Sequence, residues 1–162
     1  MPTEEARARR DRVFLVVVDD SPERAVALRY ACLRAAKSGG RVALLRVVEP
    51  VEQSEWAGIG AMMQAERRDE AETLLSGLAS QVTDITGGLP ILLLREGDAA
   101  EELLALLDED PRISILVLAT APGSKGPGPL ISALTGRLAH RLTVPMTVVP
   151  GGMSDAELER VT

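Results

Sequence analysis

The sequence predicts an α/β protein, a three-layer sandwich in which a five-stranded parallel sheet is covered by helices on both faces. Five short apolar runs, rich in β-branched residues, alternate along the chain with segments of helical character. Continuous apolar runs are typical of parallel strands buried on both faces, and the alternation implies right-handed crossover connections. The length of 162 residues fits one domain, and with one Phe, one Tyr and one Trp its core must be aliphatic.

The chain divides into an arm, one domain and a tail. Residues 1–10 are charged and unpatterned, which predicts a flexible N-terminal arm. The alternating elements occupy residues 11–150, which we expect to form the domain. In the tail, residues 151–162, Ser154 precedes Glu157 by three positions, a spacing that predicts a short capped helix.

The first elements are predicted from Val13 onward. Residues 13–18 (VFLVVV) predict a buried strand. Ser21 followed by Pro22 predicts a helix start, because the Ser hydroxyl can accept a backbone N–H and Pro loses no hydrogen bond there. That helix is expected to end near Lys37, before two glycines, and residues 41–48 (RVALLRVV) predict the second strand.

The remaining elements continue the alternation. Apolar residues at helical spacing predict a helix over residues 64–82. Asp98, three positions before Glu101, has the spacing of a capping box for a helix that ends near Asp110. The other expected elements are strands at 90–95, 113–118 and 146–149 and a helix at about 130–142.

Composition excludes several classes of function. A formal net charge of −6 and few aromatic rings argue against nucleic-acid binding. The single cysteine, Cys32, rules out an intramolecular disulfide and a multi-cysteine zinc site. No apolar stretch approaches the roughly 20 residues that span a bilayer, and the acidic start does not resemble a signal peptide. We therefore expect a cytoplasmic protein without membrane or nucleic-acid partners.

The candidate binding site follows from the fold class. Ligands of parallel sheets bind beyond the carboxyl ends of the strands, where the strand order reverses. If the first strand lies beside the fourth, this rule selects Asp19-Asp20-Ser21 and the loop 119–129. That loop contains residues typical of phosphate contact, namely Gly123, Ser124, Lys125, Gly126 and Gly128. The alternative is a stiff connecting loop, because its three prolines have no N–H to donate.

The order of these features resembles the universal stress protein family, over about residues 13–150. The resemblance rests on Val18-Asp19-Asp20-Ser21 after the first strand, on LLRVVEP at 44–50, on the glycine-rich loop and on TVPMTVVP at 143–150. It implies the sheet order 3-2-1-4-5 of the adenine nucleotide alpha hydrolase-like fold, a homodimer and, in many members, bound ATP. It also implies that Asp19 contacts the nucleoside and that the backbone at Val47 and Val48 contacts adenine.

The family's phosphate motif, G-x2-G-x9-G-Ser/Thr, fits this chain in two registers, each only in part. The first uses Gly123, Gly126 and Gly136, with Arg137 where Ser or Thr should follow. The second is anchored on the last strand and keeps the last helix at family length. It places Ala119, followed by Thr120, at the first glycine and Ser132 at the Ser/Thr. Because Asp19 and Asp20 would repel phosphates, Mg²⁺ or Lys125 would have to offset them.

Two enzymatic or signalling alternatives compete with this interpretation. The acidic pair after the first strand also resembles a response-regulator receiver domain, but no aspartate follows the third strand and no lysine follows the fifth. His140, the only histidine, has no nearby nucleophile, so no catalytic residue is assigned. Slow ATP hydrolysis is the remaining catalytic option.

The apolar strand at Met146–Val149 is expected at the edge of the sheet, where pairing with a second copy would protect it. Trp56, followed by Met62 and Met63, either packs a helix onto the sheet or flanks the nucleotide cleft or a partner surface. The sequence thus predicts a cytoplasmic homodimer that binds ATP or a related adenine nucleotide, or serves in stress response, without dedicated catalysis. The alternative is a dimeric interaction protein of the same family that binds no nucleotide.

Overall fold

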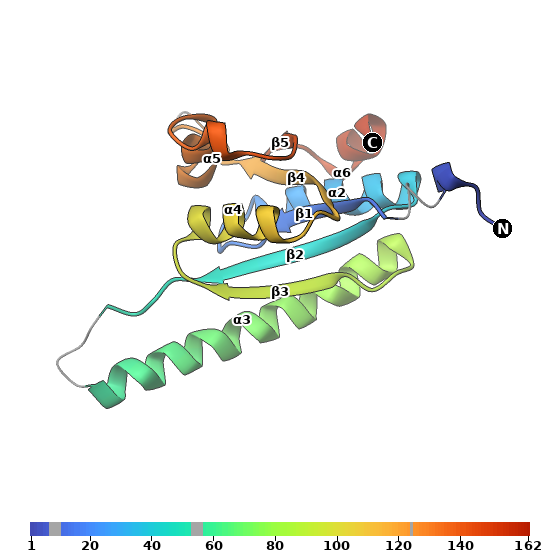
Figure 1. Cartoon of the computed structure of the whole chain (residues 1–162). Coiled ribbons are helices and arrows are strands. Elements are labelled where there is room, and N and C mark those ends of the chain that lie inside the picture. The colour runs from blue at the N-terminus through green and yellow to red at the C-terminus, as the bar shows by residue number, and fades with distance from the viewer. Residues whose placement is uncertain (7–10, 53–56, 124) are drawn as a thin grey trace.

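The fold is a central parallel sheet of five strands. A computed structural model describes residues 1–6, 11–52, 57–123 and 125–162. The strand order is β3-β2-β1-β4-β5, and every pairing is parallel, as the sequence and its family resemblance predict. The strands are β1 (Val13–Val17), β2 (Arg41–Val48), β3 (Ile91–Glu96), β4 (Ile113–Thr120) and β5 (Met146–Pro150) (Figure 1).

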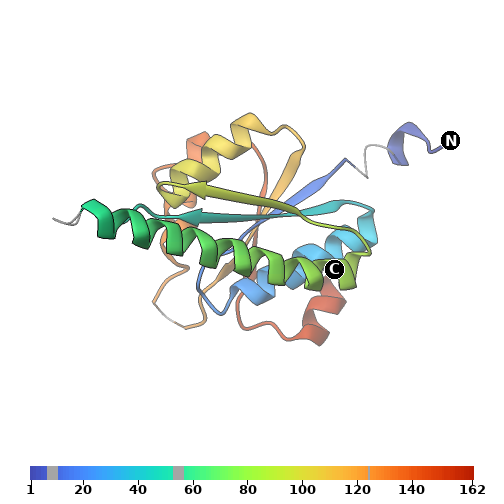
Figure 2. The same cartoon turned by 90° about the horizontal axis from the view of Figure 1, so that it is seen from below.

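Helices cover both faces of this sheet. The helices α2 and α3 pack against each other on one face, with α6 beside α2, whereas α4 and α5 contact each other on the opposite face (Figure 2). Their bounds are α2 (Arg24–Ser38), α3 (Ala57–Thr86), α4 (Ala99–Glu109), α5 (Pro129–Thr135), the 3-10 helix η1 (Ala139–Arg141) and α6 (Asp155–Val161). The three-layer α/β architecture is therefore confirmed.

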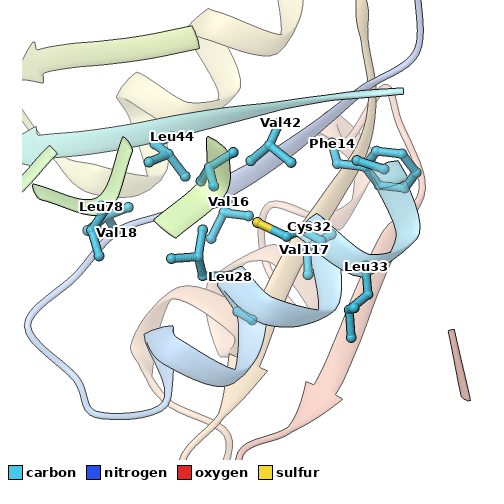
Figure 3. Close-up of a cluster of buried hydrophobic side chains, with 14 of the residues drawn as sticks. Phe14, Val16, Val18, Leu28, Cys32, Leu33, Val42, Leu44, Leu78 and Val117 are labelled. Carbon is cyan, nitrogen blue, oxygen red and sulfur yellow. The ribbon is translucent and has the colours of Figure 1, made fainter. Parts of the chain in front are cut away.

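The alternation of side chains along β1 builds a core on each face. Phe14, Val16 and Val18 belong to the cluster under α2, α3 and α6, whereas Val13 and Leu15 belong to the cluster under α4 and α5. All five are buried, which explains why the run shows no polar position. Figure 3 shows the first cluster, in which Cys32 of α2 packs among aliphatic side chains.

Two helix predictions near the strand ends were wrong. Ser21 does not cap α2, which begins at Arg24 with Glu23 as an N-cap that makes no side-chain hydrogen bond. Instead, the Ser21 hydroxyl donates to the Asp19 carboxylate. The helix expected at 130–142 breaks into α5 and η1, because Gly136 adopts φ −105° and ψ −111°, outside the helical region.

Other boundaries agree more closely. Asp98 caps α4 by accepting the N–H of Glu101, and Ser154 and Glu157 form the capping box of α6. The second strand has the predicted bounds, and the ends of the other strands differ from the predicted ones by at most two residues. Salt bridges from Arg29 to Asp155 and Glu159 hold α6 against α2.

The helix α3 is much longer than the sequence predicts. Its 30 residues span about 45 Å, whereas the six residues of β3 span about 20 Å. Its N-terminal part projects past the carboxyl ends of β2 and β3 (Figure 1). Ile59, Met62 and Met63 are exposed there, Met62 by 73%. Trp56 lies outside the described residues, so its role stays a prediction.

Candidate functional site

A cleft lies at the carboxyl ends of the central strands. It is a cavity of about 590 Å³ between the ends of β1 and β2, with α3 as one wall and the starts of α4 and α5 opposite. A volume of this size is typical of small-molecule sites. Its lining comprises Val17, Val18, Asp19, Asp20, Arg46, Val47, Val48, Glu49, Arg67, Glu70, Ala71, Leu74, Ala99, Pro129 and Leu130.

A second, smaller cavity of about 180 Å³ lies between the ends of β1 and β4. This is the position that the strand-order rule selects, and Asp19, Ser21 and Ala119 line it. The loop contributes Ala121, Pro127, Gly128 and Pro129 to its wall. Asp19 lines both cavities, so the two form neighbouring parts of one cleft around the end of β1.

Asp19 is held in a fixed orientation at the centre of this cleft. Its Oδ1 accepts the backbone N–H of Ser21 at 2.9 Å and the Ser21 hydroxyl at 2.6 Å. The Arg24 guanidinium donates to the Asp19 carbonyl at 2.7 Å. An aspartate that bonds the backbone two residues ahead is a common way to turn the chain after a strand. The turn explains why the Ser21 hydroxyl donates to Asp19 and does not cap α2.

Arg46 is the main feature of the site that sequence reasoning missed. Its guanidinium donates to the Val18 carbonyl at 3.0 Å and forms an ion pair with Asp20 at 2.9 Å. The side chain is 19% exposed, and its Nε is buried without a partner among the described residues. Arg46 therefore neutralises the charge of Asp20 within the protein, whereas the sequence suggested only Mg²⁺ or Lys125 as groups that could offset the acidic pair. The only sequence sign was a charged residue inside an apolar strand.

Val47 and Val48 lie where the resemblance implies, at the end of β2 and in the wall of the larger cavity. Val48 is buried, and its carbonyl already accepts the N–H of Gly97 at 3.0 Å. The backbone of Val48 is thus engaged with the segment after β3. A ligand group that donates to the Val48 carbonyl oxygen would share this acceptor with the Gly97 N–H.

The helix α3 supplies a wall that the sequence did not predict to be part of the site. Arg67, Glu70, Ala71 and Leu74 face the larger cavity. The Arg67 guanidinium donates to the Glu49 carbonyl at 3.4 Å, which links α3 to the loop after β2. Periodicity placed these residues on a helix, but it gave no information on which strand ends that helix would cross.

Most of the predicted phosphate residues lie away from both cavities. Gly123, Lys125 and Gly126 are exposed in the loop after β4, and Ser132 is exposed on α5. The Thr120 hydroxyl accepts the N–H of Gly151 at 3.4 Å, at the edge of the sheet. Ser124 lies outside the described residues. The binding roles of all these residues therefore stay predictions.

The strand order decides against one alternative. Receiver domains have the doubly wound order 2-1-3-4-5, in which β1 lies between β2 and β3. Here β1 lies between β2 and β4. The receiver-like interpretation of the acidic pair is therefore wrong.

Two absences hold for the residues that the structure describes. None of their helices combines the length and apolar character needed to cross a membrane. In the same part of the chain, no three His, Cys, Asp or Glu side chains gather in a way that could hold a metal ion.

Comparison with solved structures identifies a consistent set of similar folds. Universal stress protein UspA from Lactobacillus plantarum superposes with a TM-score of 0.72 at 15% identity, covering 86% of this chain and 98% of that one. A universal stress protein in complex with cAMP gives a TM-score of 0.64 at 17% identity, covering 87% and 98%. A universal stress protein family protein from Arabidopsis thaliana with AMP bound gives 0.57 at 15% identity, covering 85% and 90%.

At these identities the structures establish the fold alone. A comparison with curated proteins finds no significant match. The family model described as "Universal stress protein family" matches residues 12–150, which is most of the chain and contains the complete sheet. The chain therefore belongs to the universal stress protein family.

Proposed function

We propose that this chain is a cytoplasmic, homodimeric stress-response module that binds an adenine nucleotide in the cleft around Asp19. The observation that carries the proposal is the fixed Asp19 carboxylate beside a cavity of about 590 Å³. Two structures of similar fold support it, because one is described in complex with cAMP and the other with AMP bound.

Asp19 is suited to recognise the polar part of a nucleoside. Its Oδ1 is occupied by Ser21, whereas within the described residues its other oxygen accepts no hydrogen bond. A carboxylate oxygen of this kind accepts hydroxyl or amino donors, such as those of ribose or adenine. The apolar walls are aliphatic, from Val47, Leu74 and Leu130, so the base would be held by packing without ring stacking.

The proposed module lacks dedicated catalysis. His140 is exposed on η1 and does not line either cavity. The residues that do line the larger cavity are carboxylates, guanidiniums and aliphatic groups, without a nucleophile paired to a base. Binding without chemical turnover is therefore the function that this site supports best.

The proposed dimer forms through β5. This strand forms one edge of the sheet, because it pairs with β4 on one side only. Val148 on this strand is 40% exposed. An apolar edge strand is protected when it pairs with its own copy in a second subunit. Sedimentation at micromolar concentration should give twice the chain mass, and Val148→Glu should give the monomer; a monomeric wild type would contradict the dimer.

Titration calorimetry tests the binding function. Wild type, Asp19→Ala and the control Asp84→Ala should be titrated with ATP, ADP, AMP and cAMP, with and without Mg²⁺. Asp84 is an exposed residue on the distal part of α3 and lines neither cavity. We expect binding by wild type and Asp84→Ala and its loss in Asp19→Ala. If none of these nucleotides binds below millimolar concentration, the binding proposal fails.

The second candidate is a dimeric interaction protein that binds no nucleotide. One observation favours it: Gly123, Lys125 and Gly126, the predicted phosphate residues, line neither cavity. A dimer in sedimentation combined with no heat of nucleotide binding would support this candidate over the first.

A further inference from the structure

The charged groups around the cleft have a marked imbalance. Among the described residues that line the two cavities, carboxylates outnumber basic groups. The carboxylates are those of Asp19, Asp20, Glu23, Glu49 and Glu70, and the basic groups are the guanidiniums of Arg24, Arg46 and Arg67. The electrostatic potential within the cleft is thus negative, and low-dielectric walls increase its effect on a bound charge.

All three guanidiniums already have partners within the protein. Arg24 donates to the Asp19 carbonyl. Arg46 donates to the Val18 carbonyl and pairs with Asp20, and Arg67 donates to the Glu49 carbonyl. A phosphate would have to compete with these bonds, so the arginines do not offset the carboxylates for an incoming anion.

The described residues of the loop that would hold phosphates, 119–123 and 125–129, present few donors to the cleft. Of its residues, Ala121, Pro127, Gly128 and Pro129 line the smaller cavity, and the two prolines have no N–H. Lys125 is exposed and lines neither cavity. The following helix, α5, has seven residues and carries Pro129 in its first turn, so it adds no array of free N–H groups.

From this placement we infer that the cleft takes an adenosine derivative with at most one phosphate group at its 5′ end and discriminates against the nucleoside triphosphate. The inference rests on the proposed nucleotide site and narrows its ligand class. In this inference the ribose and the base face Asp19 and the aliphatic wall, and a neutral ligand there meets no charge repulsion from the carboxylates. Each further phosphate charge adds repulsion from Asp20, Glu23 and Glu70.

Calorimetry with adenosine, AMP and ATP in EDTA tests this inference. We expect adenosine and AMP to bind and ATP to bind at least about tenfold more weakly than adenosine at low salt. The ratio should shrink in about 0.5 M salt, because screening weakens charge repulsion. Equal or tighter binding of ATP overturns the inference but leaves the proposed function intact. Failure of all three ligands to bind overturns both.

Matched variants locate the discrimination in the named carboxylates. Asp20→Asn removes one carboxylate and releases the guanidinium of Arg46, so ATP should gain affinity relative to adenosine by about fivefold. Glu70→Gln should change the ratio in the same direction. Glu72→Gln, on the same helix but outside both cavities, is the control and should leave the ratio unchanged. An unchanged ratio in both cleft variants would overturn the inference.

Discussion

Replacing Arg46 with methionine tests how the cleft contributes to stability. Methionine keeps an unbranched apolar stem but removes the guanidinium that donates to the Val18 carbonyl and pairs with Asp20. Val18 is buried, with 2% of its surface exposed, so its carbonyl loses a charged donor at a site of restricted hydration. A hydrogen bond to a charged group contributes about 1.5–3 kcal/mol.

The pair with Asp20 adds little to that stabilisation. The Asp20 side chain is 85% exposed, and exposed ion pairs contribute about 0–1 kcal/mol. The buried Nε of Arg46 has no partner among the described residues, and its removal relieves a cost that offsets part of the loss. We therefore expect Arg46→Met to lower the free energy of unfolding by about 2 kcal/mol and Asp20→Asn by under about 1 kcal/mol.

Urea denaturation followed by far-ultraviolet circular dichroism measures both variants and their combination. The coupling energy from this double-mutant cycle should be under about 1 kcal/mol, because the carbonyl bond accounts for most of the Arg46 effect. Arg68→Met, which removes an exposed guanidinium paired with Glu96, is the control and should cost under about 1 kcal/mol. If Asp20→Asn were as destabilising as Arg46→Met, the ion pair would stabilise the fold more than the carbonyl bond does, and the reasoning from burial would be refuted.

Other predictions concern positions spread over the fold. Gly151→Ala should lower the free energy of unfolding, measured in urea, by about 2 kcal/mol or more, because its Cβ would overlap the Thr120 carbonyl and lie 2.7 Å from Glu23 Cγ. The control Gly152→Ala places its Cβ in open space and should be near neutral. Equal losses of stability in the two variants would contradict the packing argument. Burial raises the pKa of Cys32 to about 12, so the native thiol should resist a disulfide reagent at pH 8 until the protein unfolds. Because the unfolded thiol ionises first, wild type should lose stability relative to Cys32→Ala as the pH rises from about 9 toward 12; a constant difference would refute this. Ser21→Ala removes the hydroxyl that orients Asp19 and should weaken AMP binding by about threefold to tenfold, with Ser80→Ala as an unaffected control; equal affinity would show that this bond does not orient the site.

The sequence predicted the sheet because its patterns are local. The continuous apolar run at 13–18 indicated a strand that is buried on both faces of a sheet. The alternation of strands with helices then left few possible sheet topologies. Asp19, Val47 and Val48 were assigned to the cleft from local patterns too, because they stand at the ends of predicted strands and match a family motif. These three residues do line the larger cavity.

One of the errors involves a local competition for a hydroxyl, and the other two involve contacts between segments that are distant in sequence. Ser21 fits a cap by its residue type, but the nearer Asp19 carboxylate accepts its hydroxyl. Arg46 lies 28 positions after Val18, and only the pairing of β1 with β2 brings the two together. The wall made by Arg67 and Glu70 depends on the angle at which α3 crosses the sheet. Residue pattern determines none of these three outcomes.

The length of α3 makes this helix a lever arm. Its first buried residue among those described is Ala71, about 21 Å along the helix from the N-terminal residue Ala57 and about 6 Å from Arg67. A tilt of about 10° around Ala71 moves Arg67 in the cleft wall by about 1 Å and the helix tip by about 4 Å. The exposed tip near Met62 and Met63 thus amplifies any displacement of the wall, and a probe attached there would register small changes in the cleft.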